Sequence, residues 1–154
     1  MNDAAWPEAG LVGRAFALAI AADRYVHVDH EILPILGEGT HVVTDRYVQS
    51  SLVLQRIDGL DLDEVWLYNQ HVPAPAITFY LEDDPNTVKA RLATRAEQSR
   101  LEVKGSPERE LDLYREAYAH LEQLGWTQHR LDCRGCTPDD VVAAMLTRLD
   151  GIIE

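Results

Sequence analysis

The residues from 42 to 55 carry the side chains in this chain that are best suited to chemistry. A short apolar run breaks into polarity at Thr44, and Asp45 and Arg46 follow it directly. Because ligands of open α/β sheets bind at the carboxyl ends of strands, we expect this charged pair to face a pocket. A guanidinium can bind a phosphate through two hydrogen bonds, and an aspartate can orient that guanidinium, a water or a metal ion. The alternative is an ion pair at a strand end that caps the next helix.

Polar residues continue at helical spacing after this pair, at Ser50, Ser51 and Gln55. The order Asp-Arg-Tyr, then Ser-Ser, then Gln resembles the nucleotide-monophosphate signature of the thymidylate kinase family. Further segments match that family in the same order, so that the resemblance covers most of the chain. These segments are 21–24 with His27, 60–69, 76–85 and the arginine-bearing stretch 91–102.

The resemblance implies a thymidylate-kinase-like nucleoside monophosphate kinase. Such an enzyme transfers a phosphoryl group from ATP, with Mg²⁺, to dTMP or a related monophosphate, in dTDP biosynthesis. Arg46 would hold the acceptor phosphate, and Asp45 would orient it or a magnesium-bound water. The implied catalytic residues are Asp45, Arg46, Arg95 and Arg100, the last two from a lid. The implied substrate-binding residues are Ile20, Arg24, Ser50, Ser51, Leu54 and Gln55, with Arg24, Ser51 and Gln55 reading the base.

Two of these positions depart from the family pattern. Many members have an aromatic residue four places before the arginine of Ala-Asp-Arg, where this chain has Ile20. A second aromatic usually precedes the glutamine of the signature, where this chain has Leu54. The pocket would keep apolar walls but lose ring stacking and a phenolic hydroxyl. We therefore expect dTMP to bind weakly or a different monophosphate to be preferred.

The lid assignment has a structural alternative. Arg91, Arg95 and Arg100 lie in a stretch with little apolar pattern after Ala96. Such a segment can close over phosphates and neutralise charge on the transferred group. Cationic residues are also favoured at the end of a helix by its dipole.

The family's phosphate-binding loop has no counterpart in the sequence. Gly10 and Gly13 are the only N-terminal glycine pair, and no Gly-Lys-Ser/Thr follows them. We expect the chain to begin at the family's second helix, without its first strand, and its ATP site to be incomplete. The alternative function is a non-catalytic nucleotide-binding or regulatory module on the same scaffold.

The elements that position these residues alternate between helices and strands. A helix is predicted over 9–36, ended by Pro34 and the glycines that follow, and a strand over 41–44. Further strands are predicted at 77–81, covered on both faces, and at 126–131. The expected fold is an α/β parallel sheet flanked by helices, in one domain of residues 1–154, like the P-loop nucleoside monophosphate kinases but missing the first strand.

Local signals mark where the remaining helices begin. Asp61 and Glu64 have the spacing of a capping box. Aspartate, serine and threonine precede Pro85, Pro107 and Pro138, which predicts a helix start at each proline. The apolar stripe of the helix from 107 is predicted to comprise Leu111, Tyr114, Ala117, Tyr118, Leu121 and Leu124.

The amino-acid composition limits which binding partners the chain can have. A net charge of -12 argues against a nucleic-acid polymer or an anionic membrane. No apolar run approaches the roughly 18 residues of a membrane helix, and no signal peptide is evident, so we expect a cytoplasmic protein. The helix over 9–36 has more apolar positions than one face needs. Phe16, Ile20 and Val26 are therefore candidates for a symmetric homodimer contact, as the family resemblance also implies.

Cys133 and Cys136 form a C-x-x-C ahead of a predicted helix. A redox dithiol is conceivable because a helix N-terminus favours thiolates. Zinc would need two further ligands, and only His129 is near in sequence. The simpler interpretation is a pair of loop cysteines.

Overall fold

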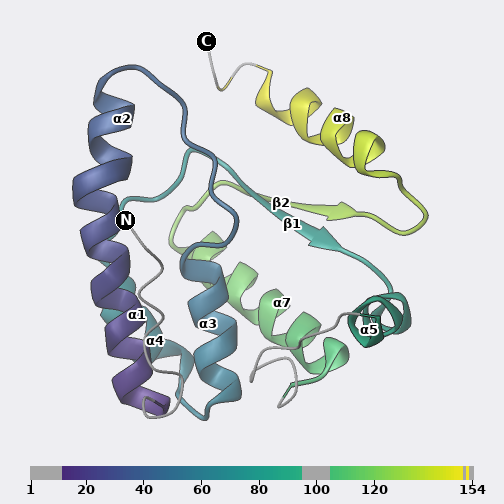
Figure 1. Ribbon diagram of the computed structural model, residues 1–154, viewed down its shortest axis with the longest axis horizontal. Helices are drawn as coiled ribbons and strands as arrows, with labels where there is room; N and C mark the ends of the chain where they lie inside the picture. Colours follow the sequence, from purple (N-terminus) through teal and green to yellow (C-terminus); the bar gives the residue numbers. More distant parts are fainter. Residues whose placement is uncertain (1–11, 95–104, 151, 153–154) are drawn as a thin grey trace. The chain divides into compact units, whose positions relative to one another are not determined.

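The computed structural model describes residues 12–94, 105–150 and 152. The chain divides into two compact units, residues 1–72 and 73–154, and each has its own internal packing. The first unit is helical, whereas the second contains the two strands of the described residues (Figure 1).

A long helical rod forms the first part of the N-terminal unit. It consists of α1 (Gly13–His27), a π-helical turn, η1 (Val28–Ile32), and α2 (Leu33–Gly37). The predicted helix is thus confirmed from residue 13 onward, except that Pro34 does not end it. Proline lacks an N–H, and its ring crowds the carbonyl four residues back. The wider π turn directly precedes it, and the helix instead ends at Gly37.

Helices α3 (Val48–Ile57) and α4 (Leu62–Asn69) pack against α1 and against each other (Figure 1). The helix α1 contributes small buried residues to this contact, Ala17 and Ala21. Their short side chains let the neighbouring helices approach closely. The fully buried side chains opposite them are larger: Val48, Leu52, Val53 and Val65.

Two predictions for the first unit are wrong. Residues 41–44 form no strand, and Val43 is 93% exposed. Strand hydrogen bonds require a neighbouring strand, and the sheet of the described residues pairs only segments of the second unit. The helix α4 begins at Leu62 as predicted, but the Asp61 side chain makes no capping bond. The Glu64 carboxylate accepts hydrogen bonds from Arg14 and the Tyr68 hydroxyl instead.

The second unit contains the parallel strands β1 (Thr78–Glu82) and β2 (Gln128–Asp132). Thr78 lies opposite Gln128, and Glu82 lies opposite Asp132. Both predicted strands and their parallel pairing are confirmed, with boundaries shifted slightly toward the C-terminus. Helices α5 (Pro85–Ala93), α7 (Pro107–Gln123) and α8 (Pro138–Leu149) accompany them.

All three predicted proline-initiated helices begin with the expected caps. The Asp84 carboxylate accepts from the backbone N–H groups of Asn86 and Thr87, at 2.9 and 3.3 Å. Ser106 caps α7, and Thr137 forms a reciprocal capping box at the start of α8. Each cap satisfies backbone donors that a helix end leaves without an intrahelical partner.

Helix α7 covers one face of the two-stranded sheet. Tyr80 and Gln128 are buried on that face, and the Tyr80 hydroxyl donates to Gln128 Oε1 at 2.7 Å. Gln128 Nε2 in turn donates to the carbonyl of Tyr118 on α7 at 3.0 Å. On the other face Leu81 is 57% exposed, so the expectation that the strand is covered on both faces is wrong.

The apolar stripe of α7 is only partly as predicted. Ala117 and Leu121 are buried, but the third buried position is Leu113, and Leu124 is 48% exposed. The rings of Tyr114 and Tyr118 each form a T-shaped pair with the Tyr80 ring. No helix in the described part of the chain is long and apolar enough to cross a membrane.

Candidate functional site

Helix α3 buries an unusual set of polar side chains. Gln49, Ser50, Ser51 and Gln55 are all less than a tenth exposed, in a helix of 10 residues. Burying a polar group costs free energy unless it is hydrogen-bonded. A short helix that buries amides and hydroxyls beside Leu52 and Val53 therefore needs polar partners, and Arg24 of α1 supplies one.

The guanidinium of Arg24 joins the helices of the first unit. Its Nη2 donates to Ser51 Oγ at 2.7 Å and to the Tyr47 carbonyl at 3.4 Å. Its Nη1 donates to Asn69 Oδ1 of α4, and its carbon lies 5.7 Å from the centroid of the Tyr47 ring. The sequence-predicted Arg24 and Ser51 are thus in direct contact.

Arg24 forms no direct ion pair within the described residues, and the neighbouring Asp23 only partly offsets the effect of burial on the pKa of Arg24. Its side-chain hydrogen bonds go only to a hydroxyl, an amide and a carbonyl. Burial lowers the pKa of the Arg24 guanidinium, because removing a charge from water disfavours the charged form. Nearby anionic charge would offset that cost. The site is therefore suited to a negatively charged or carbonyl-rich ligand.

Asn69 is fixed in the orientation that Arg24 requires. It is 1% exposed, and its Nδ2 donates to the Val65 carbonyl one turn earlier, at 2.7 Å. The amide oxygen is thereby turned toward the guanidinium. Tyr25 adds a second link between α1 and α4, because its hydroxyl donates to the Tyr68 carbonyl at 3.1 Å.

Gln55 lies one helical turn beyond Ser51 on the same face of α3. It is 3% exposed, and its Oε1 atom has no hydrogen-bond partner among the described residues. A buried amide oxygen without a partner is costly, typically about 1–3 kcal/mol. This atom is the acceptor that a ligand N–H could satisfy.

The Asp45–Arg46 pair lies in an exposed bend directly before α3. Arg46 has a φ of 68°, in the left-handed region that non-glycine residues adopt at a cost. The next carbonyl, that of Tyr47, accepts both from Ser50 N–H at 3.2 Å and from Arg24. The bend is thus tied to the arginine of α1, which brings the Asp-Arg signature to the polar end of α3.

The remaining predicted residues divide into two groups. Ile20 and Leu54 are half-buried. Ile20 lies one helical turn before Arg24 on α1, and Leu54 directly precedes Gln55 on α3. Arg95 and Arg100 lie outside the described residues. Arg91 forms an ion pair with Asp83 at 2.8 Å near the end of α5, in accord with the helix-end interpretation of that arginine.

The hydrogen-bond network around Arg24 comprises Arg24, Ser51, Tyr47 and Asn69. The sequence did not predict two of these residues, Asn69 and Tyr47. The available signal for Asn69 was a polar residue four places after Val65, on the apolar stripe of α4. Tyr47 belongs to the Asp-Arg-Tyr triplet, but only the structure shows its carbonyl and ring against Arg24.

No preformed metal site accompanies this network. Within residues 12–94, 105–150 and 152, no group of three or more histidine, cysteine, aspartate or glutamate side chains is arranged to hold a metal ion. The exposed Asp45 is a single carboxylate donor at the bend.

The strands and helices define an α/β protein with a parallel sheet flanked by helices, and the first unit contains the polar network around Arg24. Comparison with known proteins specifies this class. A family model described as thymidylate kinase matches residues 8–128. The chain therefore belongs to the thymidylate kinase family, and the predicted resemblance is confirmed.

Individual relatives match over part of their length. A probable thymidylate kinase of Pyrobaculum calidifontis is 38% identical over 86 residues, which are 56% of this chain and 45% of that protein. A thymidylate kinase of Rickettsia africae is 30% identical over 115 residues, 70% of this chain and 52% of that protein. A probable thymidylate kinase of Staphylothermus marinus is 44% identical over 69 residues, 45% of this chain and 35% of that protein. The chain thus spans about half the length of these relatives or less.

Proposed function

We propose that this chain binds the phosphoryl acceptor of a thymidylate-kinase-type reaction, dTMP or a related nucleoside monophosphate. The observation that carries the proposal is the half-buried Arg24, whose hydrogen bonds within the described residues go only to neutral groups. A ligand with a phosphate and a carbonyl-bearing base adds negative charge and acceptors beyond those that Asp23 and the neutral partners provide. Family membership supports this class of ligand.

Each end of the ligand has a matching group. Arg46, in the bend before α3, holds the acceptor phosphate, and Asp45 orients that arginine or a magnesium-bound water. Arg24 and Ser51 meet the carbonyl edge of the base. The Gln55 amide, whose Oε1 has no partner in the described residues, accepts from a base N–H. Ser50, Ile20 and Leu54 form the surrounding wall.

The donor side of the reaction is ATP with Mg²⁺, as family membership suggests. Phosphoryl transfer relies mainly on positioning and on neutralising charge. In the proposed reaction, Arg95 and Arg100 approach the transferred group as the lid. The 154-residue sequence contains no GxxxxGK[ST] motif, so the chain holds the acceptor but lacks the loop that cradles ATP.

Calorimetry with dTMP tests the acceptor site. Arg46→Ala should weaken binding by about 1.5–3 kcal/mol, the value of a hydrogen bond to a charged group. Arg109→Ala removes the same charge from an exposed position on α7 and should leave affinity unchanged. Unchanged affinity in both Arg46→Ala and Arg24→Met would refute the site.

A second candidate function is a non-catalytic nucleotide-binding or regulatory module, for which the polar network around Arg24 alone would suffice. Incubating the purified chain with ATP, Mg²⁺ and dTMP separates acceptor binding from turnover. We expect the monophosphate to bind and negligible diphosphate to form, because half of the positioning is missing. Robust diphosphate formation by this chain would show that the donor site is complete after all and would exclude the non-catalytic module.

A further inference from the structure

The connection from β2 to α8 places two thiols at the ends of one tight turn. Cys133 and Cys136 are its first and fourth residues, and the Cys136 N–H donates to the Cys133 carbonyl at 3.1 Å. Gly135, the third residue, has a φ of +71°, as a type II turn requires. The first and fourth Cα atoms of a β-turn lie within about 7 Å. Disulfides need about 4.4–6.8 Å, so the turn brings the two residues within bridging range.

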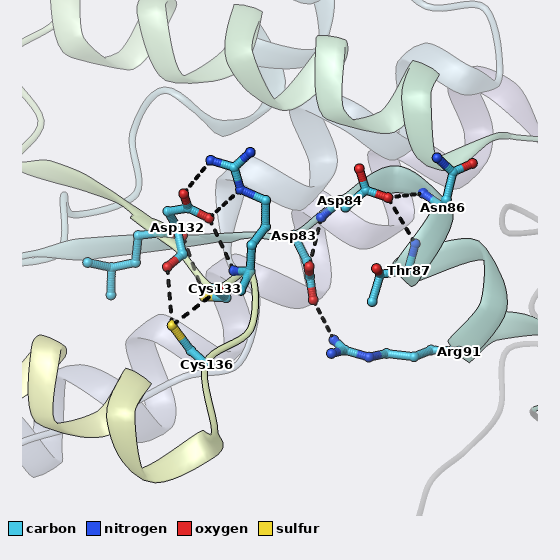
Figure 2. A network of polar contacts seen from close by, with 10 residues as sticks. Asp83, Asp84, Asn86, Thr87, Arg91, Asp132, Cys133 and Cys136 are labelled. Carbon is cyan, nitrogen blue, oxygen red and sulfur yellow. Dashed lines mark hydrogen bonds and ion pairs between the residues drawn. The ribbon is translucent and has the colours of Figure 1, made fainter.

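The turn is held on the sheet by polar contacts. The Cys133 N–H donates to the Glu82 carbonyl of β1 at 2.7 Å. The Arg134 backbone N–H and its side-chain Nε both donate to Asp132 Oδ1, at 3.1 and 2.8 Å. Figure 2 shows Asp132 beside Cys133 and Cys136 at this turn. These bonds hold the backbone between the cysteines. The Cys133 Sγ lies 3.5 Å from the Leu131 carbonyl and the Cys136 Sγ lies 3.6 Å from the Asp132 carbonyl, so both thiols must turn away from these weak contacts to form a bridge.

We propose that Cys133 and Cys136 form a reversible intramolecular disulfide by exchange with a low-molecular-weight disulfide, for which oxidised glutathione is the probe. The Cys136 thiolate attacks one glutathione sulfur, the glutathione S–S bond breaks, and one glutathione thiolate leaves and takes up a proton. Cys133 then loses its proton to solvent and attacks the Cys136 sulfur, which releases the second glutathione. The two cysteines lose two electrons, and these reduce one glutathione disulfide to two thiols.

Exposure decides the order of attack. Cys136 is exposed, whereas Cys133 is half-buried. Burial raises the pKa of the Cys133 thiol, and the nearby Cys136, Asp83 and Asp132 raise it further, because they disfavour a second negative charge. Cys136 therefore meets the oxidant first, and Cys133 resolves the mixed disulfide.

This bridge is an exchange site rather than a structural staple. Only two residues separate the cysteines, so closing the loop removes little conformational entropy from the unfolded chain. A zinc interpretation finds no support in the described segments, where no three potential ligands gather. This proposal is independent of nucleotide binding.

The test is to equilibrate the full chain in glutathione redox buffers, trap free thiols with N-ethylmaleimide and measure intact mass. In oxidising buffer we expect a monomer whose mass is lower by two hydrogens and which carries no maleimide. In reducing buffer the bridge should open, and the chain should then carry two maleimide groups. Stable glutathione on both cysteines, disulfide-linked chain dimers, or two free thiols in the most oxidising buffer would each overturn the proposal.

Variants test the order of attack and the turn. Cys133→Ser should stop at a single glutathione adduct on Cys136, and Cys136→Ser should form its adduct more slowly. Gly135→Ala should lower the equilibrium constant for closure roughly tenfold, because the reduced turn can relax away from the left-handed conformation that strains an alanine, whereas the bridged turn cannot. Gly125→Ala, at a φ of +82° after α7, carries similar strain away from the thiols and should leave closure unchanged. Equal closure in the two glycine variants would show that the turn does not pair the cysteines.

Discussion

The contact between Arg24 and Asn69 allows a stability prediction that depends on the polar network alone. Asn69→Leu keeps the branching and number of side-chain heavy atoms, but it removes the amide oxygen that accepts from the guanidinium and the Nδ2 bond to the Val65 carbonyl. A hydrogen bond to a charged group contributes about 1.5–3 kcal/mol. Arg24 is only half-buried, and it keeps its bonds to Ser51 and Tyr47, so we expect the lower end, about 1.5–2 kcal/mol.

Arg24→Met should also destabilise the chain, by about 1–3 kcal/mol, because it leaves the buried Asn69 oxygen without a partner. The double variant Arg24→Met/Asn69→Leu leaves neither group unpaired. It should therefore be more stable than the sum of the single effects predicts, by on the order of 1 kcal/mol.

Urea unfolding, followed through the tryptophan fluorescence of the chain, to which Trp66 on α4 contributes, measures the free energy of unfolding of each variant. Gln70→Leu changes an exposed amide next to Asn69 and should alter stability by less than about 0.5 kcal/mol. Strictly additive effects of the two network substitutions would refute the coupling between Arg24 and Asn69. A cost of Asn69→Leu as small as that of Gln70→Leu would do the same.

Three further predictions concern other parts of the chain. Burial and two neighbouring tyrosines raise the pKa of Tyr80. Above about pH 10 the unfolded state therefore binds fewer protons than the folded state, and the free energy of unfolding should fall as the pH rises. Urea midpoints at pH 9 and 11 should show this fall, and Tyr80→Phe should reduce it. A homodimer through Phe16, Ile20 and the 52% exposed Val26 should be weakened by Val26→Asp in light scattering, and a monomeric parent chain would contradict the prediction. Asp84→Ala should cost about 1 kcal/mol by removing the cap of α5, and Asp84→Asn should restore most of it in urea unfolding.

Features set by short-range chemistry could be predicted from the sequence. A capping side chain followed by a proline predicts where a helix begins, because the proline ring fixes φ near the helical value. This rule places the helix starts at Pro85, Pro107 and Pro138. The strands follow from apolar runs between turn residues, and βαβ alternation implies their parallel pairing. Arg24 and Ser51 were predicted through a family signature, in which the order of residues stands for a shared three-dimensional arrangement.

Features that depend on distant partners were decided only by the tertiary structure. Residues 41–44 have the composition of a strand, but in the described structure no neighbouring strand completes their hydrogen bonds. Glu64 had the spacing of a capping box, yet Arg14, 50 residues away, competes for its carboxylate. The sequence assigned no role to Asn69, because only the fold places Arg24 against it. A pattern along the chain specifies which groups need partners, but the packing of the helices selects which partners they have.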